Sequence, residues 1–374
     1  MKIAAIKERE KGEARVAITP DMVKMYVRKG FRVFVERGIG VAANFTDSEY
    51  EDAGAAVSSV LLEILSDADI ILKVQPTPLV DQFNEIDMAK TGACIVGLLS
   101  PYYSKEYLDK AAAKGLSTVA MELVPRVTKA QGMDALSSQS NLAGYRAVIE
   151  ASYHFDRAFP MMMTAAGTVN PAKVLVLGVG VAGLQAIATA KRLGGVVSAY
   201  DVRLAAKEQA ESLGAKFVYP ADLSDSEDKS GYAKEVGKDY QAIQERFFMQ
   251  IIDKFDIVVT TALIPGKKAP ILLTKEMVAK MKPGSVIVDL AAVAGGNVED
   301  SSEDRVSVKK GVKIISWTNI ASKIASDSSK LYAKNLYNFI DYAVKDRKIN
   351  FTDELVEEMT ITHDGSVINK KFKV

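Results

Sequence analysis

The chain has 374 residues, 48% of them hydrophobic and 25% charged, which is an ordinary balance for a soluble globular protein and suggests two domains. Its 48 basic and 47 acidic residues leave a net charge of +1, so no strong field attracts nucleic acid or an anionic membrane. A single cysteine, Cys94, excludes an intrachain disulfide and a paired-cysteine metal site, and we expect no bound metal.

The most apolar run, Val174 to Ala190, approaches the length of a membrane span. Glycines, Gln185 and Thr189 interrupt it, so a strand, a turn and a helix are the better interpretation. The charged N-terminal segment lacks the apolar core of a signal peptide. We therefore expect no transmembrane segment, and any association with a membrane would come through partners.

Short β-rich runs alternate with helical patterns in the first third of the chain. Strands are predicted over 2–6, 31–36, 69–74, 93–99 and 117–122, and helices over 20–29 and 104–114. This alternation is typical of βαβ units and of a parallel sheet.

A long helix is predicted from Ser138 to Phe159, and the serines and asparagine of SSQSN favour an N-cap at its start. A second set of strands follows, predicted over 173–178, 195–202, 216–219, 256–262, 285–291 and 312–317. A further helix over 329–344 and a hairpin turn at Asp364-Gly365 complete the pattern.

The two sets together predict an α/β protein of two Rossmann-like domains with parallel sheets, joined by long helices, with a cleft between them. We assign 1–136 and 326–374 to the N-terminal, flavodoxin-like or Rossmann-like domain. Residues 137–325 form the second domain, which is inserted in the first. The polar segment 221–238 is too long for a tight connection and predicts a lid or a disordered segment.

The segment VLVLGVGVAGLQ carries Gly178, Gly180 and Gly183 in the GxGxxG spacing of a dinucleotide-binding turn. It follows an apolar β-run and opens a helical pattern. Gly178 would allow the tight turn, Gly180 the approach of a pyrophosphate, and Gly183 the close packing of helix and strand. A glycine-rich turn without a ligand is the weaker alternative in this context.

Asp201 follows at the end of the next predicted strand, where the motif places an acidic residue. Its carboxylate would accept hydrogen bonds from ribose hydroxyls and repel a 2′-phosphate, which favours NAD(H) over NADP(H). Arg203 argues the other way, since a nearby arginine accommodates that phosphate. We weigh Asp201 more heavily because it lies at the strand end, and predict NAD(H) as the cofactor.

A dehydrogenase that oxidises an alcohol or an amine also moves a proton, usually with a histidine or a lysine. The chain has two histidines, His154 and His363, for which packing or surface roles are the better interpretation. Hydride transfer between two nicotinamide rings needs no such group, only rings held face to face with water excluded. The absence of an evident acid–base residue in the sequence favours hydride transfer between two nicotinamide rings.

Several segments resemble the NAD(H)-binding component of proton-translocating NAD(P) transhydrogenase, and the likeness covers nearly the whole chain. They are MKIAAIKEREKGEARVAITPDMV, AMELVPRVTKAQGMDALSSQSNLAGYRAV, MMMTAAGTV, YDVR and TTALIPGKKAP. The related alanine dehydrogenases share the opening segment and the Rossmann segment.

The resemblance implies an NAD(P)+ transhydrogenase that works only with partners. In such a complex NADH passes its hydride to NADP+ held on a separate NADP(H)-binding component, and a membrane component conducts protons. It further implies a homodimer, placed in the cytoplasm or an organelle matrix and peripheral to a membrane through its partners.

The resemblance also assigns roles to particular residues. The catalytic set is Arg126, Gln131 and Asp134, which approach the nicotinamide, with Tyr232. Ser137 and Ser138 correspond to serines that hold the carboxamide. The other inferred nucleotide contacts are Gly132, Met133, Val181, Ala182, Gly183, Asp201, Val202, Arg203, Gly231, Gln244 and Leu263, with Gly231 and Tyr232 on a loop that closes over the nucleotide.

The chain departs from the family pattern at three positions. Gly132 stands where serine is usual, which we expect to loosen its loop, and Val293 replaces an acidic residue. Gly97 lies near the position of a catalytic histidine in alanine dehydrogenases. Arg15 and Lys73 match substrate-binding positions of those enzymes, but structural pairing is the better interpretation for both. An alanine dehydrogenase-like enzyme and a non-catalytic NAD(H) sensor are the alternative functions.

Overall fold

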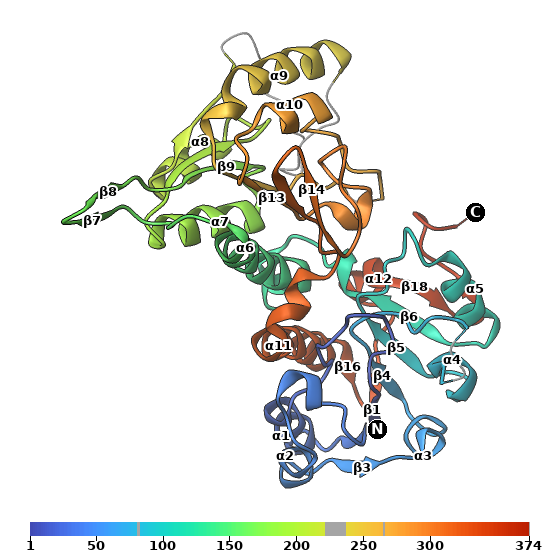
Figure 1. The fold of residues 1–374 in the computed structure, drawn as a ribbon. Coiled ribbons are helices and arrows are strands. Elements are labelled where there is room, and N and C mark those ends of the chain that lie inside the picture. Colours follow the sequence, from blue (N-terminus) through green and yellow to red (C-terminus); the bar gives the residue numbers. More distant parts are fainter. Residues whose placement is uncertain (81–82, 221–236, 265, 374) are drawn as a thin grey trace. The chain divides into compact units, whose positions relative to one another are not determined.

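The structure is a computed structural model that describes residues 1–80, 83–220, 237–264 and 266–373 (Figure 1). The chain divides into two compact units, one formed by residues 1–139 with 321–374 and the other by residues 140–320. Each unit contains a largely parallel sheet with helices, so the predicted fold class is confirmed.

The first unit is built on an eight-stranded sheet that is parallel except at its C-terminal hairpin. In spatial order its strands are β19 (Ser366–Val367), β18 (Thr360–His363), β6 (Ser117–Ala120), β5 (Cys94–Gly97), β4 (Ile70–Leu72), β1 (Lys2–Ala5), β2 (Arg32–Glu36) and β3 (Ala56–Ser58). The predicted hairpin turn is confirmed, since Asp364 and Gly365 between β18 and β19 have φ values of 46° and 77°.

Helices of the first unit surround this sheet. They are α1 (Pro20–Arg28), α2 (Asp47–Asp52), α3 (Leu61–Leu65), α4 (Glu85–Met88), α5 (Lys105–Ala113), α11 (Ala325–Ala343) and α12 (Glu354–Met359), with the 3-10 turns η1 (Val41–Ala43), η2 (Met121–Leu123), η3 (Thr128–Met133) and η6 (Ile320–Ile324). The short strands β16 (Val344–Lys345) and β17 (Lys348–Ile349) pair with each other after α11.

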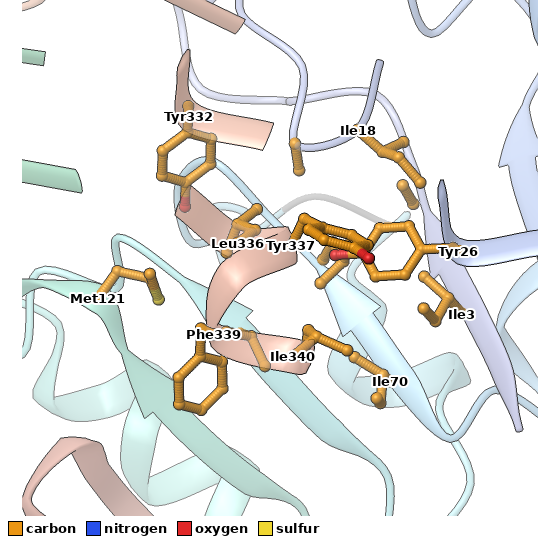
Figure 2. Packing of buried hydrophobic residues seen from close by; sticks show 14 of the residues in the cluster. Ile3, Ile18, Tyr26, Ile70, Met121, Tyr332, Leu336, Tyr337, Phe339 and Ile340 are labelled. Atoms are coloured by element: carbon orange, nitrogen blue, oxygen red, sulfur yellow. The ribbon is translucent and has the colours of Figure 1, made fainter. Parts of the chain in front are cut away.

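Helix α11 supplies much of the core of the first unit (Figure 2). Leu336, Phe339 and Ile340 are fully buried, at the three- and four-residue spacing that lines one face of a helix. The ring of Tyr337 packs edge-on against that of Tyr26 in α1, with 5.1 Å between the centroids. Because this face is packed in the core, α11 is held in place, and its other residues can support a loop.

The second unit is built on a seven-stranded sheet that is parallel except for one edge strand. In spatial order its strands are β11 (Lys216–Phe217), β10 (Val196–Tyr200), β9 (Lys173–Leu177), β12 (Ile257–Thr260), β13 (Val286–Asp289), β15 (Val312–Ile315) and β14 (Val306–Lys309). Alternate residues of β9 belong to two different core clusters, so both faces of the sheet are covered.

The helices of the second unit follow its strands in the βαβ manner. They are α7 (Val181–Arg192), α8 (Ala206–Ser212), α9 (Lys238–Ile251) and α10 (Lys275–Lys280), with the 3-10 turns η4 (Ile252–Lys254) and η5 (Ala292–Ala294). A separate hairpin, β7 (Met162–Thr164) with β8 (Gly167–Val169), precedes β9.

The long helix α6 (Ala135–His154) begins earlier and ends earlier than the sequence predicts. It begins at Ala135 rather than Ser138 because the side chain of Asp134 supplies the cap. Its end at His154, rather than Phe159, lies well before Pro160, whose ring disfavours helical conformation in the residue ahead of it. No helix in the described ranges combines the length and the apolar character that crossing a bilayer requires.

Candidate functional site

A side chain at each of the three motif glycines would meet a different environment in the second unit. Gly178, at the end of β9, has φ +99°, and a Cβ there would lie 2.4 Å from the Thr261 hydroxyl oxygen. A Cβ on Gly183 would lie 1.8 Å from the Gly178 carbonyl oxygen, so only glycine allows this contact of turn and helix. A Cβ on Gly180 would meet no atom of the described residues within 4 Å, which leaves open space over the turn.

Helix α7 begins directly at this turn, with Gly180 as its N-cap and no side chain of the described residues capping it. The first N–H groups of a helix have no partner within the helix, and here they belong to Val181, Ala182 and Gly183. Val181 is exposed and Ala182 is partly exposed. An uncapped helix start beside an open glycine turn fits the pyrophosphate of a dinucleotide.

Asp201 lies just after β10, next to the same turn, and is 5% exposed. One carboxylate oxygen accepts a hydrogen bond from the Val179 N–H at 2.8 Å, so Asp201 also holds the turn in place. Arg203 donates to both oxygens through Nε and Nη2, each at 2.9 Å. The sequence did not predict this ion pair. In it the Arg203 guanidinium offsets the negative charge of Asp201, which would otherwise repel a 2′-phosphate. Val202 lies between the two and is partly exposed.

Leu263 lies in the loop after β12 and is 45% exposed. Asn297 binds both backbone polar groups of the neighbouring Ala262. Its Oδ1 accepts from the Ala262 N–H at 3.0 Å, and its Nδ2 donates to the Ala262 carbonyl at 2.9 Å. Asp289, fully buried, accepts in turn from the Asn297 N–H at 2.9 Å and from the Thr260 hydroxyl at 3.0 Å. Asn297 and Asp289 thus shape this loop, and no spacing in the sequence singles them out.

Gln244 lies on α9 and is 6% exposed. Its Nε2 donates to the Tyr200 hydroxyl at 2.9 Å, and that hydroxyl also lies 3.1 Å from the hydroxyl of Tyr240. The side chain of Gln244 therefore lies in the packing between α9 and β10. Gly231 and Tyr232 lie outside the described residues.

In the first unit, η3 carries Gln131, Gly132 and Met133 directly ahead of α6. Gln131 is exposed, Met133 is buried, and Arg126 lies exposed between η2 and η3. Asp134 follows η3 and is partly buried. The loop therefore presents Arg126 and Gln131 to solvent while Met133 anchors it.

The cap of α6 differs from our prediction. Asp134 accepts from the backbone N–H of Ser137 at 2.8 Å, so Asp134 takes the place expected for the SSQSN segment. Its second oxygen accepts from the Ser137 hydroxyl at 2.5 Å. The prediction was wrong because aspartate precedes the serines by one turn and its carboxylate is the stronger acceptor.

Gly132, which we expect to loosen its loop, accepts two side-chain hydrogen bonds that hold the loop at this position. The Gly132 carbonyl accepts hydrogen bonds from the side-chain amides of Asn335 at 2.9 Å and Asn338 at 2.7 Å, both on α11. A Cβ at position 132 would lie 2.8 Å from Nδ2 of Asn338. The loop is fixed through its backbone, which a sequence pattern does not show.

Arg15 and Lys73 are paired within the first unit, as their structural interpretation predicted. Arg15 is 6% exposed and donates to both carboxylate oxygens of Glu13, at 2.8 and 2.6 Å. Lys73 is fully buried with its Nζ 3.1 Å from Glu8. Burial works against the charged form of Lys73, but the carboxylates around it outweigh burial and keep its pKa above the usual value.

Gly97 lies where the backbone leaves no room for a side chain. A Cβ there would lie 2.6 Å from the Lys73 carbonyl oxygen, so the backbone around it excludes a side chain. The two histidines of the chain lie elsewhere: His154 is the last residue of α6, and His363 shares a 2.8 Å hydrogen bond with Ser117 across β18 and β6. Val293, in η5, is 57% exposed and carries no acid–base group.

The glycine turn, the uncapped helix and Asp201 define a dinucleotide-binding α/β protein. Two family models match the chain, the alanine dehydrogenase/PNT N-terminal domain over residues 4–143 and the alanine dehydrogenase/PNT C-terminal domain over residues 147–370. The chain belongs to this family.

Within the family the chain is similar to the alpha subunit of NAD(P) transhydrogenase in its divided form. It is 61% identical to the first piece of that subunit from Rickettsia prowazekii, over 99% of this chain and 96% of that protein. It is 51% identical to the corresponding piece from Rhodospirillum rubrum, over 99% and 98% of the two chains. The crystal structure of transhydrogenase from Sinorhizobium meliloti shares 48% identity, with a TM-score of 0.89 over 98% of this chain and 99% of that one. The chain is thus related to an NAD-binding oxidoreductase component.

Proposed function

We propose that the chain is the NAD(H)-binding component of a proton-translocating transhydrogenase. When bound, NADH supplies a hydride from its C4, which joins C4 of NADP+ on a partner component, giving NAD+ and NADPH with no proton consumed. The observation that carries the proposal is the open glycine turn at Gly180 in a chain that also presents the exposed Gln131 loop. The family supports NAD(H) binding, and the transhydrogenase relatives support this reaction over others.

The second unit would bind the nucleotide by its phosphates and its adenosine. The N–H groups of Val181, Ala182 and Gly183 would donate to the pyrophosphate, with the helix dipole of α7 favouring its charge. Asp201 would accept from the ribose hydroxyls. Because Arg203 already occupies both of its oxygens, ribose binding requires the guanidinium to share them or to turn away.

The serines of α6 would recognise the carboxamide in one defined orientation. The Ser137 hydroxyl donates its single proton to Asp134. The Ser138 hydroxyl has two acceptors for its proton, Oδ1 of Asn335 at 2.7 Å and the Ala135 carbonyl at 3.1 Å. With both protons committed, the two oxygens have only lone pairs to offer. They would therefore accept hydrogen bonds from the NH2 group of the carboxamide.

Arg126, Gln131 and Asp134 would orient the nicotinamide rather than exchange protons with it. Hydride transfer between two nicotinamides needs alignment and exclusion of water, and these hydrogen-bonding groups can supply the alignment. The catalytic histidine of alanine dehydrogenases is expected near Gly97, and at Gly97 itself the Lys73 carbonyl leaves no room for a side chain. This lack of room is the reason for preferring transhydrogenation to amino-acid oxidation.

Partners follow from the proposal. An NADP(H)-binding component would receive the hydride, and a membrane component would conduct the protons. A second copy of this chain would cover the hairpin of β7 and β8, where Met161, Met162 and Met163 are 59%, 43% and 77% exposed. An isolated two-stranded hairpin is marginally stable in water, which favours a protein surface against it. A change of Met163 to aspartate would then shift the sedimentation of the protein towards that of the monomer.

The decisive experiment mixes the purified protein with the NADP(H)-binding component of a relative, NADH and an NADP+ analogue whose reduced form has its own absorbance. Reduction of the analogue only when both components are present supports the proposal. Tight NADH binding without any transfer would favour an NAD(H) sensor. Turnover of pyruvate, ammonia and NADH by this chain alone would favour an alanine dehydrogenase.

A further inference from the structure

One side chain of helix α11 connects the loop that carries Gln131 to the first turn of helix α6. Asn335 on α11 donates from Nδ2 to the Gly132 carbonyl at 2.9 Å. Its Oδ1 accepts from the Ser138 hydroxyl, in the first turn of α6, at 2.7 Å. The amide group of Asn335 thus joins the loop to the start of α6.

The orientation of this amide follows from the chemistry of its neighbours. A backbone carbonyl only accepts, so the atom of Asn335 that faces Gly132 must be the nitrogen. The oxygen then faces Ser138, whose hydroxyl has a donor to give. Both halves of the amide are satisfied in this orientation, whereas after a flip its oxygen would face the Gly132 carbonyl with no proton between the two acceptors.

Asn338 lies one turn further along α11 and donates to the same Gly132 carbonyl at 2.7 Å. The two asparagines nonetheless differ. Asn335 is 8% exposed and also bonds to Ser138, whereas Asn338 is partly exposed and its hydrogen bond to the carbonyl is exposed to solvent. Water can replace the Asn338 amide at the surface but has little access to the Asn335 position.

We propose that Asn335 is a positioning residue for hydride transfer: it sets the loop of Gln131 against α6 and orients the Ser138 oxygen. The inference rests on the proposed function, because it assigns the loop and Ser138 to the nicotinamide. The Ser138 hydroxyl lies 2.7 Å from Oδ1 of Asn335 and 3.1 Å from the Ala135 carbonyl, so Asn335 is the nearer acceptor for its proton. With the proton turned towards Asn335, the Ser138 oxygen presents lone pairs to the carboxamide NH2. Reaction rates respond steeply to such positions, since a displacement of about 1 Å costs on the order of a hundredfold.

The test compares Asn335→Ala with Asn338→Ala in the hydride-transfer assay with the partner component. Asn335→Ala should slow transfer at saturating NADH by roughly tenfold to a hundredfold. Its Kd for NADH should change by less than about threefold, because the residues proposed to bind the phosphates and the adenosine make no contact with Asn335. Asn338→Ala should stay within about twofold of the unaltered protein in both measurements. Equal rates for the two variants, or an equal loss in rate and in NADH affinity, would overturn the inference.

The pH dependence of the rate of Asn335→Asp tests whether residue 335 must donate a hydrogen bond. A protonated carboxyl can donate to Gly132 from one oxygen and accept from Ser138 with the other, whereas a carboxylate can only accept. The rate of Asn335→Asp relative to the unaltered protein should therefore rise as the pH falls. The same ratio for Asn335→Ala should stay constant. A constant ratio for Asn335→Asp would contradict the proposed donor role.

Hydrogen exchange of the backbone amides in 128–138 separates this inference from the proposed function. Asn335→Ala should exchange faster in this segment than Asn338→Ala does. If the unaltered protein transfers no hydride, the proposed function fails, and the exchange measurement still shows whether Asn335 holds the loop. Equal exchange in the two variants would overturn the inference even if hydride transfer is found.

Discussion

Asp134 holds Ser137 by two hydrogen bonds, one from its backbone N–H at 2.8 Å and one from its hydroxyl at 2.5 Å. The same carboxylate therefore begins helix α6 and fixes the direction of the serine proton. The start of the helix and the candidate nicotinamide contact therefore depend on the same group. The Asp134 carboxylate caps the helix and also takes the Ser137 hydroxyl proton, which leaves Ser137 with lone pairs to offer. Changes at Asp134 should accordingly alter both stability and chemistry.

The change Asp134→Ala removes the cap and frees the Ser137 hydroxyl. Loss of an N-cap side chain should lower the free energy of unfolding by about 1 kcal/mol. Asp134→Asn keeps an acceptor for the N–H and should lose only a few tenths of that amount. Thermal unfolding of the two variants measures the difference. Equal destabilisation by both would show that the charge, not the cap, is what matters.

Gly180→Ala and Gly183→Ala form a matched pair in the nucleotide turn. A Cβ on Gly183 would lie 1.8 Å from the Gly178 carbonyl, so Gly183→Ala should destabilise the second unit by about 1–3 kcal/mol. Around Gly180 the space is open, so Gly180→Ala should unfold close to the temperature of the unaltered protein. Its added methyl would instead meet the pyrophosphate and weaken NADH binding by about tenfold or more. Unchanged NADH affinity in Gly180→Ala would place the pyrophosphate elsewhere.

The change Asp201→Asn tests the cofactor preference. The amide oxygen can still accept from the Val179 N–H, so the turn should persist, while the charge that disfavours a 2′-phosphate is lost. Arg203, released from its ion pair, becomes available to a phosphate. Titrations with NADH and NADPH should show the preference for NADH narrowing by about tenfold. The control is Arg203→Ala, which should leave the preference for NADH at least as large as before.

Glu122, in η2 of the first unit, links the stability of that unit to pH. Its carboxylate accepts from the backbone N–H groups of Leu99 at 3.1 Å and Ser100 at 2.5 Å, yet burial raises its pKa from 4.5 to about 7. Between these two values the folded protein holds a proton that the unfolded chain has released, so stability falls as the pH rises from 4.5 to about 7.

Glu122→Gln should remove the part of this pH-dependent loss of stability that Glu122 causes, which amounts to about 3 kcal/mol at most. Urea unfolding at about pH 5 and about pH 8, on either side of the shifted pKa, measures it. The unaltered protein should lose more stability between the two conditions than Glu122→Gln does. If both lose the same amount, Glu122 is already ionised in the more acidic condition and its pKa is not raised.

The fold was predictable because its signals are local. Alternating apolar runs indicated the strands of both sheets, and the spacing of Gly178, Gly180 and Gly183 indicated the turn between β9 and α7. The edge strand β3 was missed because three partly or fully exposed residues carry no hydrophobic pattern.

The support of the candidate site was not predictable, because it depends on contacts between residues far apart in the sequence. Asn335 meets Gly132 from a helix near the other end of the chain, and Asn297 holds Ala262 across two loops. Asparagine in a polar surface pattern gives no sign of such a role. The start of α6 was misjudged although its signal is local, because Asp134, Ser137 and Ser138 all suit an N-cap and the sequence does not show which of them the helix uses.

The strongest test of the proposed function is hydride transfer from NADH to an NADP+ analogue with the NADP(H)-binding partner present, compared between the unaltered protein and Gln131→Ala. Gln131 is exposed on its loop, so its loss should leave stability unchanged. We predict partner-dependent transfer, slowed by Gln131→Ala far more than NADH binding is weakened. No transfer by the unaltered protein despite tight NADH binding, or turnover without the partner, would contradict the proposed function.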